Sequence, residues 1–155
     1  MSEAIQVTTF VAVDPATAFE VFTGEVDSWW RRGPRFRWLP DVRGTLRFEG
    51  GAGGRLVEQS GEEVFEVGKI LAWEPAHRLV FELRGRNGEE TVVDVLFQQG
   101  AAGTRVVIEH RGWAAIADDH PARHGLTGEA FDAMMGVWWG DLLVALRTYL
   151  VEETP

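Results

Sequence analysis

The feature that most constrains the fold is the apolar segment FDAMMGVWWGDLLVALRTYL, which runs from residue 131 to residue 150. When its residues are placed at the 100° steps of an α-helix, large apolar side chains cover about half of the circumference. Such an arc is wider than the roughly 100° stripe of a helix on a protein surface. The segment therefore predicts a long helix, from about Thr127 to Val151, that a curved sheet has to wrap. The centre of the arc is formed by Phe131, Met135, Trp138, Leu142, Leu146 and Tyr149.

The rest of the chain predicts such a sheet. Residues 4–13 are rich in β-branched side chains and predict a strand, after which Asp14 and Pro15 predict the start of a short helix. A second helical turn and a long Arg- and Pro-rich insert at residues 31–44 come next. Strand-like runs then alternate with Gly, Asn and Pro turns from residue 45 to 113, which is typical of an antiparallel meander.

These elements predict a single α+β domain over residues 1–155. We expect a curved antiparallel sheet of about six or seven strands around the long C-terminal helix, with two short helices after the first strand. Because side chains alternate between the faces of a strand, Val106, Ile108 and His110 should share one face. The sequence EPAH at residues 74–77 predicts a type I turn, since Pro favours its second position.

Composition excludes several classes of function. The formal net charge is -9, which argues against binding to nucleic acid or to an anionic membrane surface. The chain contains no Cys, so disulfides, thiolate chemistry and Cys-ligated metals are excluded. The start MSEAIQVTTF lacks the features of a signal peptide, and no apolar run is long enough to span a membrane. We therefore expect a cytoplasmic protein.

Four stretches carry a resemblance to a known family. They are VDPATAFEVFT with SWW at 28–30, GKILAWEPAHRLVFEL at 68–83, GTRVVIEHRGW at 103–113 and WWGDLLVALRTYL at 138–150. Together they resemble the START-like (SRPBCC) superfamily, and within it the proteins related to the activator of the 90-kDa heat-shock protein ATPase. The resemblance implies the helix-grip fold, also called birch-pollen-allergen-like. It leaves function open, because this fold serves binding, transport and occasional catalysis.

A sheet curled around a helix can leave a cavity lined by large apolar side chains, or the same side chains can fill it as a core. The sequence does not separate these cases, although seven Trp in 155 residues favour a partly open cavity. We expect such a cavity to hold a small apolar or amphipathic ligand. Its predicted wall consists of Trp29, Phe48, Phe81, Phe97, His110, Trp113, Met135, Trp138 and Leu142.

Two other functions remain open at this stage. The family name implies a cochaperone-like domain that contacts a chaperone or another protein, and a homodimer is compatible with the sequence. A cyclase- or hydrolase-like enzyme could use His110 as its acid or base. No cofactor or metal is predicted, because Pro121 interrupts the helical spacing of His120 and His124. We interpret Glu58, Glu66 and Asp94 as residues of a solvated strand face.

Overall fold

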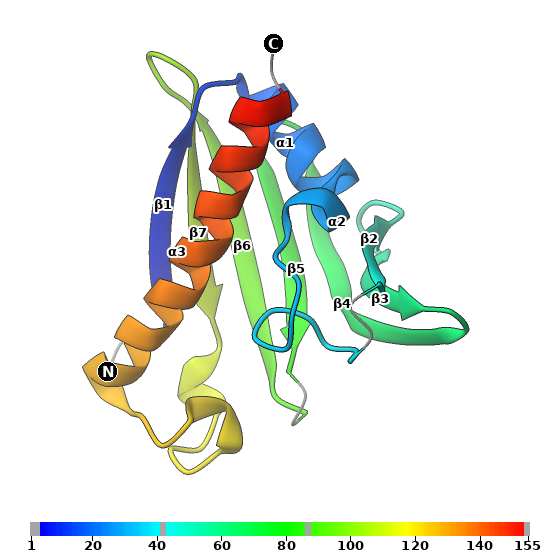
Figure 1. The fold of residues 1–155 in the computed structure, drawn as a ribbon. Helices are drawn as coiled ribbons and strands as arrows, with labels where there is room; N and C mark the ends of the chain where they lie inside the picture. Colours follow the sequence, from blue (N-terminus) through cyan, green and yellow to red (C-terminus); the bar gives the residue numbers. More distant parts are fainter. Residues whose placement is uncertain (1–3, 41–42, 86–87, 154–155) are drawn as a thin grey trace.

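The computed structural model describes residues 4–40, 43–85 and 88–153 (Figure 1). Its elements follow the predicted order, with a long insert between the second helix and the second strand. In chain order they are β1 (Ala4–Val11), α1 (Pro15–Gly24), α2 (Val26–Trp29), β2 (Thr45–Glu49), β3 (Arg55–Ser60), β4 (Glu63–Glu74), β5 (Arg78–Arg84), β6 (Glu90–Gln99), β7 (Thr104–Arg111), the 3-10 turns η1 (Trp113–Ala115) and η2 (Pro121–Arg123), and α3 (Gly128–Glu153).

Within these residues the strands form one seven-stranded antiparallel sheet in the order β1-β7-β6-β5-β4-β3-β2. Helix α3 crosses the concave side of the sheet, and α1 and α2 lie beside it (Figure 1). Asp14 caps α1 by accepting a hydrogen bond from the Thr17 N–H at 2.8 Å, and Pro15 is the first helical residue. The α+β helix-grip prediction is confirmed.

The pairing of the strands brings together, on one face of the sheet, the side chains that were predicted to point inward. His110 of β7 lies opposite Ile5 of β1 and Val93 of β6, and Val93 in turn lies opposite Phe81 of β5. Because directly opposed residues share a face of an antiparallel sheet, these four side chains point toward α3. All four are buried, as are Val106 and Ile108, which confirms the period-two assignment.

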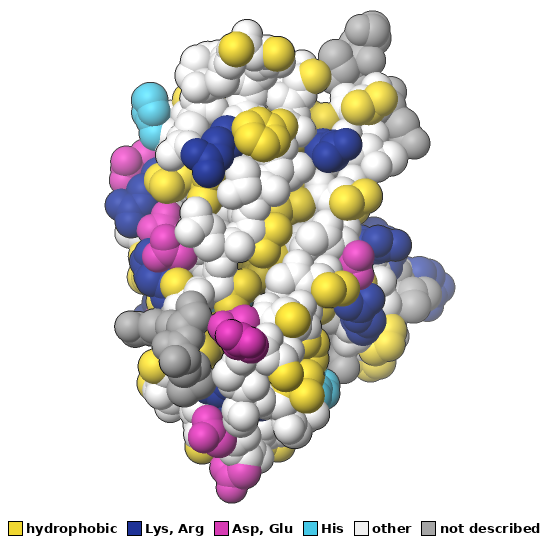
Figure 2. Space-filling view, turned by 90° about the vertical axis from the view of Figure 1, so that its left-hand side faces the viewer, with side chains coloured by type: hydrophobic (Ala, Val, Ile, Leu, Met, Phe, Trp, Pro, Cys, Tyr) yellow, Lys and Arg dark blue, Asp and Glu magenta, His cyan; other side chains and the backbone are white. Residues whose placement is uncertain are grey.

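Helix α3 turns its buried face slightly away from the predicted centre of the arc. Trp139, Leu142 and Leu146 are fully buried, whereas Trp138 and Tyr149 are only partly buried. The opposite side exposes Val137, Val144 and Val151, one residue every seven. Viewed from the left of Figure 1, the surface mixes hydrophobic side chains with acidic and basic ones (Figure 2).

The turn between β4 and β5 differs from the expected type. The His77 N–H donates to the Glu74 carbonyl at 2.9 Å, as in a β-turn, but Ala76 has φ of 69°. A positive φ at the third position defines a type II turn, so the type I prediction was wrong. Pro75 suits the second position of both types, and the sequence signal for type II, a Gly or Asn at the third position, is absent here.

Candidate functional site

The insert at residues 31–44 covers the space between α3 and the sheet with aromatic side chains. Phe36 stacks on Trp138 of α3 with 5.6 Å between the ring centroids, and Trp38 stacks on Phe65 of β4 at 6.4 Å. The Trp138 Nε1–H donates to the Arg35 carbonyl at 2.7 Å, which ties the helix to the insert. This attachment fixes Trp138 against the insert, while its neighbour Trp139 is fully buried in the core.

Two buried charged residues hold the insert in place. Glu58 of β3 is 1% exposed, and its Oε1 accepts hydrogen bonds from the N–H groups of Trp38 at 2.6 Å and Leu39 at 3.2 Å. The guanidinium of Arg37 is buried as well and donates to Asp27 Oδ1 at 2.8 Å and to the Trp30 carbonyl at 2.7 Å. Interpreting Glu58 as a solvated side chain was therefore wrong.

The Asp27 carboxylate interacts with three groups that hold the insert in place. It accepts from Arg37 and from the Leu46 N–H at 2.9 Å, and it pairs with Arg32 at 2.8 Å. Burial alone would raise the pKa of Asp27, but these hydrogen bonds and positive charges lower it below its usual value. The carboxylate thus stays ionised and joins α2, the insert and β2.

Asp94 also differs from the sequence interpretation as a solvated residue, whereas Glu66 keeps part of its side chain in solvent. Asp94 is buried and pairs with Arg78 at 2.7 Å and Arg111 at 3.0 Å. Burial would raise the pKa of Asp94, but the two Arg residues hold it below its usual value. Glu66 is partly exposed and pairs with Arg84 at 3.1 Å. Both carboxylates form ion pairs, and neither lines the cavity that lies beneath the insert.

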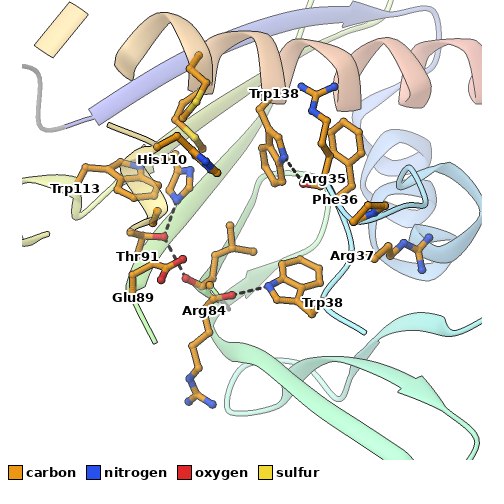
Figure 3. A pocket seen from close by; sticks show the side chains of 17 residues that line it. Arg35, Phe36, Arg37, Trp38, Arg84, Glu89, Thr91, His110, Trp113 and Trp138 are labelled. Atoms are coloured by element: carbon orange, nitrogen blue, oxygen red, sulfur yellow. Dashed lines mark hydrogen bonds between the residues drawn. The ribbon is translucent and has the colours of Figure 1, made fainter. Parts of the chain in front are cut away.

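Beneath the insert lies a cavity of about 590 Å³ (Figure 3). It is open to solvent on one side, and its walls come from the insert, the N-terminal half of α3, the adjoining ends of β5, β6 and β7 and the segment around η1 and η2. Figure 3 shows Trp138, Phe36 and Trp38 toward one end, and Trp113, His110, Thr91 and Glu89 toward the other. The described lining consists of Pro34, Arg35, Phe36, Arg37, Trp38, Leu83, Arg84, Gly85, Glu89, Thr91, His110, Trp113, Ala122, His124, Met134, Met135 and Trp138.

His110 lies at the end of the cavity near Trp113 and Glu89, where it takes part in a chain of hydrogen bonds. Trp139 Nε1–H donates to His110 Nδ1 at 3.0 Å, so the proton of the neutral ring must lie on Nε2. That Nε2–H donates to Thr91 Oγ1 at 2.6 Å, and the Thr91 hydroxyl donates to the Leu83 carbonyl at 3.1 Å. Burial lowers the pKa of His110 from 6.5 to about 3, so the ring is neutral at neutral pH.

Two other polar atoms at this end have no hydrogen-bond partner among the described residues. They are Trp113 Nε1 and Glu89 Oε2, and both are shielded from solvent. His120 Nε2 lies 3.8 Å from Glu89 Oε2, which is beyond hydrogen-bond distance. Gly85 makes room for the acid, since a Cβ at that position would overlap the Glu89 carboxylate.

The structure brings together four of the nine residues of the predicted wall. His110, Trp113, Met135 and Trp138 line the cavity. Four of the others lie in the packed interior: Trp29, which donates to the Phe22 carbonyl at 3.1 Å, Phe81, Phe97 and Leu142. The fifth, Phe48, is partly buried and packs against Phe81 with 5.4 Å between the ring centroids. Sequence reasoning missed Glu89, Thr91 and the aromatic residues of the insert. The RFRW run at residues 35–38 was the available signal, because aromatic residues are uncommon in a solvated loop.

His120 and His124 do not share a helical face. Pro121 begins the 3-10 turn η2, His120 Nδ1 accepts the Ala122 N–H at 3.0 Å, and His124 has a left-handed φ of 52°. Among residues 4–40, 43–85 and 88–153, no group of three or more His, Asp or Glu is placed to hold a metal ion. No helix in this part of the chain is both long and apolar enough to cross a membrane.

A curved antiparallel sheet gripping one long helix, with a cavity under its N-terminal half, defines the START-like class. Residues 12–149 match the family model described as activator of Hsp90 ATPase homolog 1-like protein. The match spans most of the chain, and the protein belongs to this family. The resemblance identified from the sequence is thereby confirmed. No curated protein sequence matches the chain.

Solved structures share the fold at low sequence identity. Protein MLL2253 from Mesorhizobium loti is similar with a TM-score of 0.69 at 16% identity, over 98% of each chain. The Aha1 dimer from Colwellia psychrerythraea has a TM-score of 0.65 at 15% identity, over 97% of this chain and 96% of that chain. CalU16 from Micromonospora echinospora has a TM-score of 0.63 at 18% identity, over 95% of this chain and 75% of that chain.

Proposed function

We propose that this protein binds a small apolar or amphipathic molecule in the cavity beneath the insert. The observation that carries the proposal is the cavity of about 590 Å³, within the size range of small-molecule sites. Met134, Met135 and Leu83 offer an adaptable apolar lining, and Phe36, Trp38 and Trp138 offer flat aromatic faces. A few polar groups at the far end complete the combination typical of ligand pockets.

The geometry of His110 favours binding over catalysis. A general acid or base needs a ring nitrogen within reach of the substrate. Both His110 nitrogens are already engaged, one by Trp139 and one by Thr91. The low pKa of about 3 also leaves the ring a weak base at neutral pH. The enzyme alternative, in the form that uses His110, therefore has little support from this site.

Filling the cavity should abolish ligand uptake. The neutral, polarity-sensitive dye N-phenyl-1-naphthylamine should bind the wild-type protein with enhanced, blue-shifted emission. Met135 lines the cavity, so the indole of Met135→Trp should occupy the space and weaken dye binding by at least about tenfold. Fluorescence titration measures the effect.

The matched control is Val137→Trp, which adds an indole two residues away on the same helix. Val137 is 59% exposed on the outer side of α3, so this variant should bind the dye as the wild type does. The proposal fails if the wild type does not bind the dye, or if both Trp variants bind it equally well. Native mass spectrometry of the freshly purified protein would give independent support by showing co-purified small molecules.

A second candidate function is protein interaction. Its support is the family description, activator of Hsp90 ATPase homolog 1-like protein, together with similarity to a relative described as a dimer. We propose a chaperone or a second copy of this chain as the partner to test if the cavity takes up no dye. Sedimentation of the purified protein then measures self-association directly.

A further inference from the structure

The outer face of α3, on the side away from the sheet, has the pattern of a helix that packs against another helix. We infer that two copies of this chain associate through this face, with their α3 helices side by side and antiparallel. The two-fold axis lies near residue 138, in the middle of the helix. The inference names the surface for self-association, the second candidate function proposed above, and does not depend on the cavity.

A row of exposed apolar side chains runs along this face. Val137, Val144 and Val151 are 59%, 57% and 70% exposed. Since seven residues make nearly two helical turns, the three side chains lie in one line. Figure 1 shows α3 in front of the sheet, and no described element covers its outer side. Single exposed apolar residues are ordinary on a surface, but a repeat of seven is typical of helices that pack in pairs.

Two charged residues that flank this row favour a second copy as the partner. Glu129 and Arg147 are both exposed and lie on the same side of the helix, because the 18 residues that separate them make about five turns. They are about 27 Å apart along the axis, too far to pair within one chain. In an antiparallel pair, each Glu129 lies beside Arg147 of the partner subunit, and symmetry forms this ion pair twice. A parallel pair would bring like charges together.

The same alignment places valine against small residues. With Glu129 level with Arg147 of the partner subunit, Val137 lies beside the partner's Gly140, and Val144 lies beside the partner's Ala133. Ala133 is exposed, and a Cβ added at Gly140 would meet nothing within 4 Å, so both positions are open on the outer side. Small residues opposite valine let the two helices approach closely.

Sedimentation of the purified protein tests the inference. One helix pair makes a small interface and each copy carries a net charge of -9, so the wild type should pass from monomer to dimer between about 5 and 500 µM. Glu129→Arg or Arg147→Glu alone should raise the dissociation constant at least about tenfold, because like charges then meet. Both changes together restore opposite charges and should return it to within about threefold of the wild type. Glu62→Arg is the control, since it makes the same charge change in the exposed turn between β3 and β4.

Single Cys variants test the antiparallel arrangement, because the chain has no Cys of its own. In Val137→Cys the two thiols lie near the two-fold axis and should form a disulfide across the dimer on mild oxidation. In Val151→Cys they would lie about 40 Å apart along the helices and should stay reduced. Non-reducing gel electrophoresis measures the linked dimer.

Each outcome decides a different point. A wild type that stays monomeric at the highest concentration would overturn the inference together with self-association, and would leave dye binding in the cavity untouched. A dimer whose dissociation constant is the same in every charge variant would overturn this face alone. Linkage of Val151→Cys as readily as Val137→Cys would overturn the antiparallel arrangement. Circular dichroism shows whether each variant is folded, and the two Cys variants decide the matter if a charge variant is not.

Discussion

Lowering the pH from 6.5 to about 4.5 should reduce the free energy of unfolding by about 2 kcal/mol through His110 alone. The folded protein keeps this ring neutral until about pH 3, because burial depresses its pKa from the ordinary 6.5. The unfolded chain binds a proton on the same ring below about pH 6.5. The unfolded state therefore gains protons first, and stability falls as the pH falls. Urea denaturation at several pH values measures the slope.

The matched control for this prediction is His110→Gln, whose amide cannot titrate. Its stability should change much less over the same range, even if it is lower throughout. The low pKa values of Asp27 and Asp94 keep their contributions out of this window, since those are lost only below the ordinary value of 3.8. An equal loss of stability in the variant and the wild type would show that His110 is not the group responsible.

Replacing Leu142 by Ala should destabilise the protein by about 2–5 kcal/mol. Leu142 lies in the middle of α3, is completely buried and belongs to the packed core rather than to the cavity. Removing three carbon atoms there, Cγ and the two Cδ methyl groups, leaves a space that the surrounding side chains only partly refill. Thermal or urea denaturation of the purified variant measures the loss.

Val144→Ala serves as the control in the same helix. Val144 is 57% exposed, so this change should alter the free energy of unfolding by no more than about 0.5 kcal/mol. A cost below about 1 kcal/mol for Leu142→Ala would contradict the packing described here. It would mean that the open space extends along α3 past Trp138.

The faces of the strands could be predicted from the sequence because alternation is a local property. It placed Phe81, Phe97 and His110 on the inner face of the sheet, where the structure has them. Alternation does not tell how far along the sheet a residue lies. Phe97 packs against Phe22 of α1, whereas His110 lies at the cavity. A shared face was thus predictable, and a shared site was not.

The orientation of neighbouring residues on α3 was equally hard to predict. Trp138 and Trp139 are adjacent, and both fall within the broad apolar arc. Their different roles follow from long-range contacts: Trp139 donates to His110, and Trp138 donates to the backbone of Arg35 in the insert. The insert itself is held by Glu58, whose partners are backbone N–H groups about twenty residues away. Such contacts leave no periodic pattern in the sequence.

The indole N–H signals of the Trp residues test ligand binding in the cavity most directly. In a titration of ¹⁵N-labelled protein with N-phenyl-1-naphthylamine, the signals of Trp113 and Trp138 should shift, because both residues line the cavity. The signal of Trp73, which packs against Phe19 and Phe48 outside the cavity, should stay in place. Unchanged Trp113 and Trp138 signals at saturating dye, or a shift of Trp73 alone, would contradict binding in this cavity.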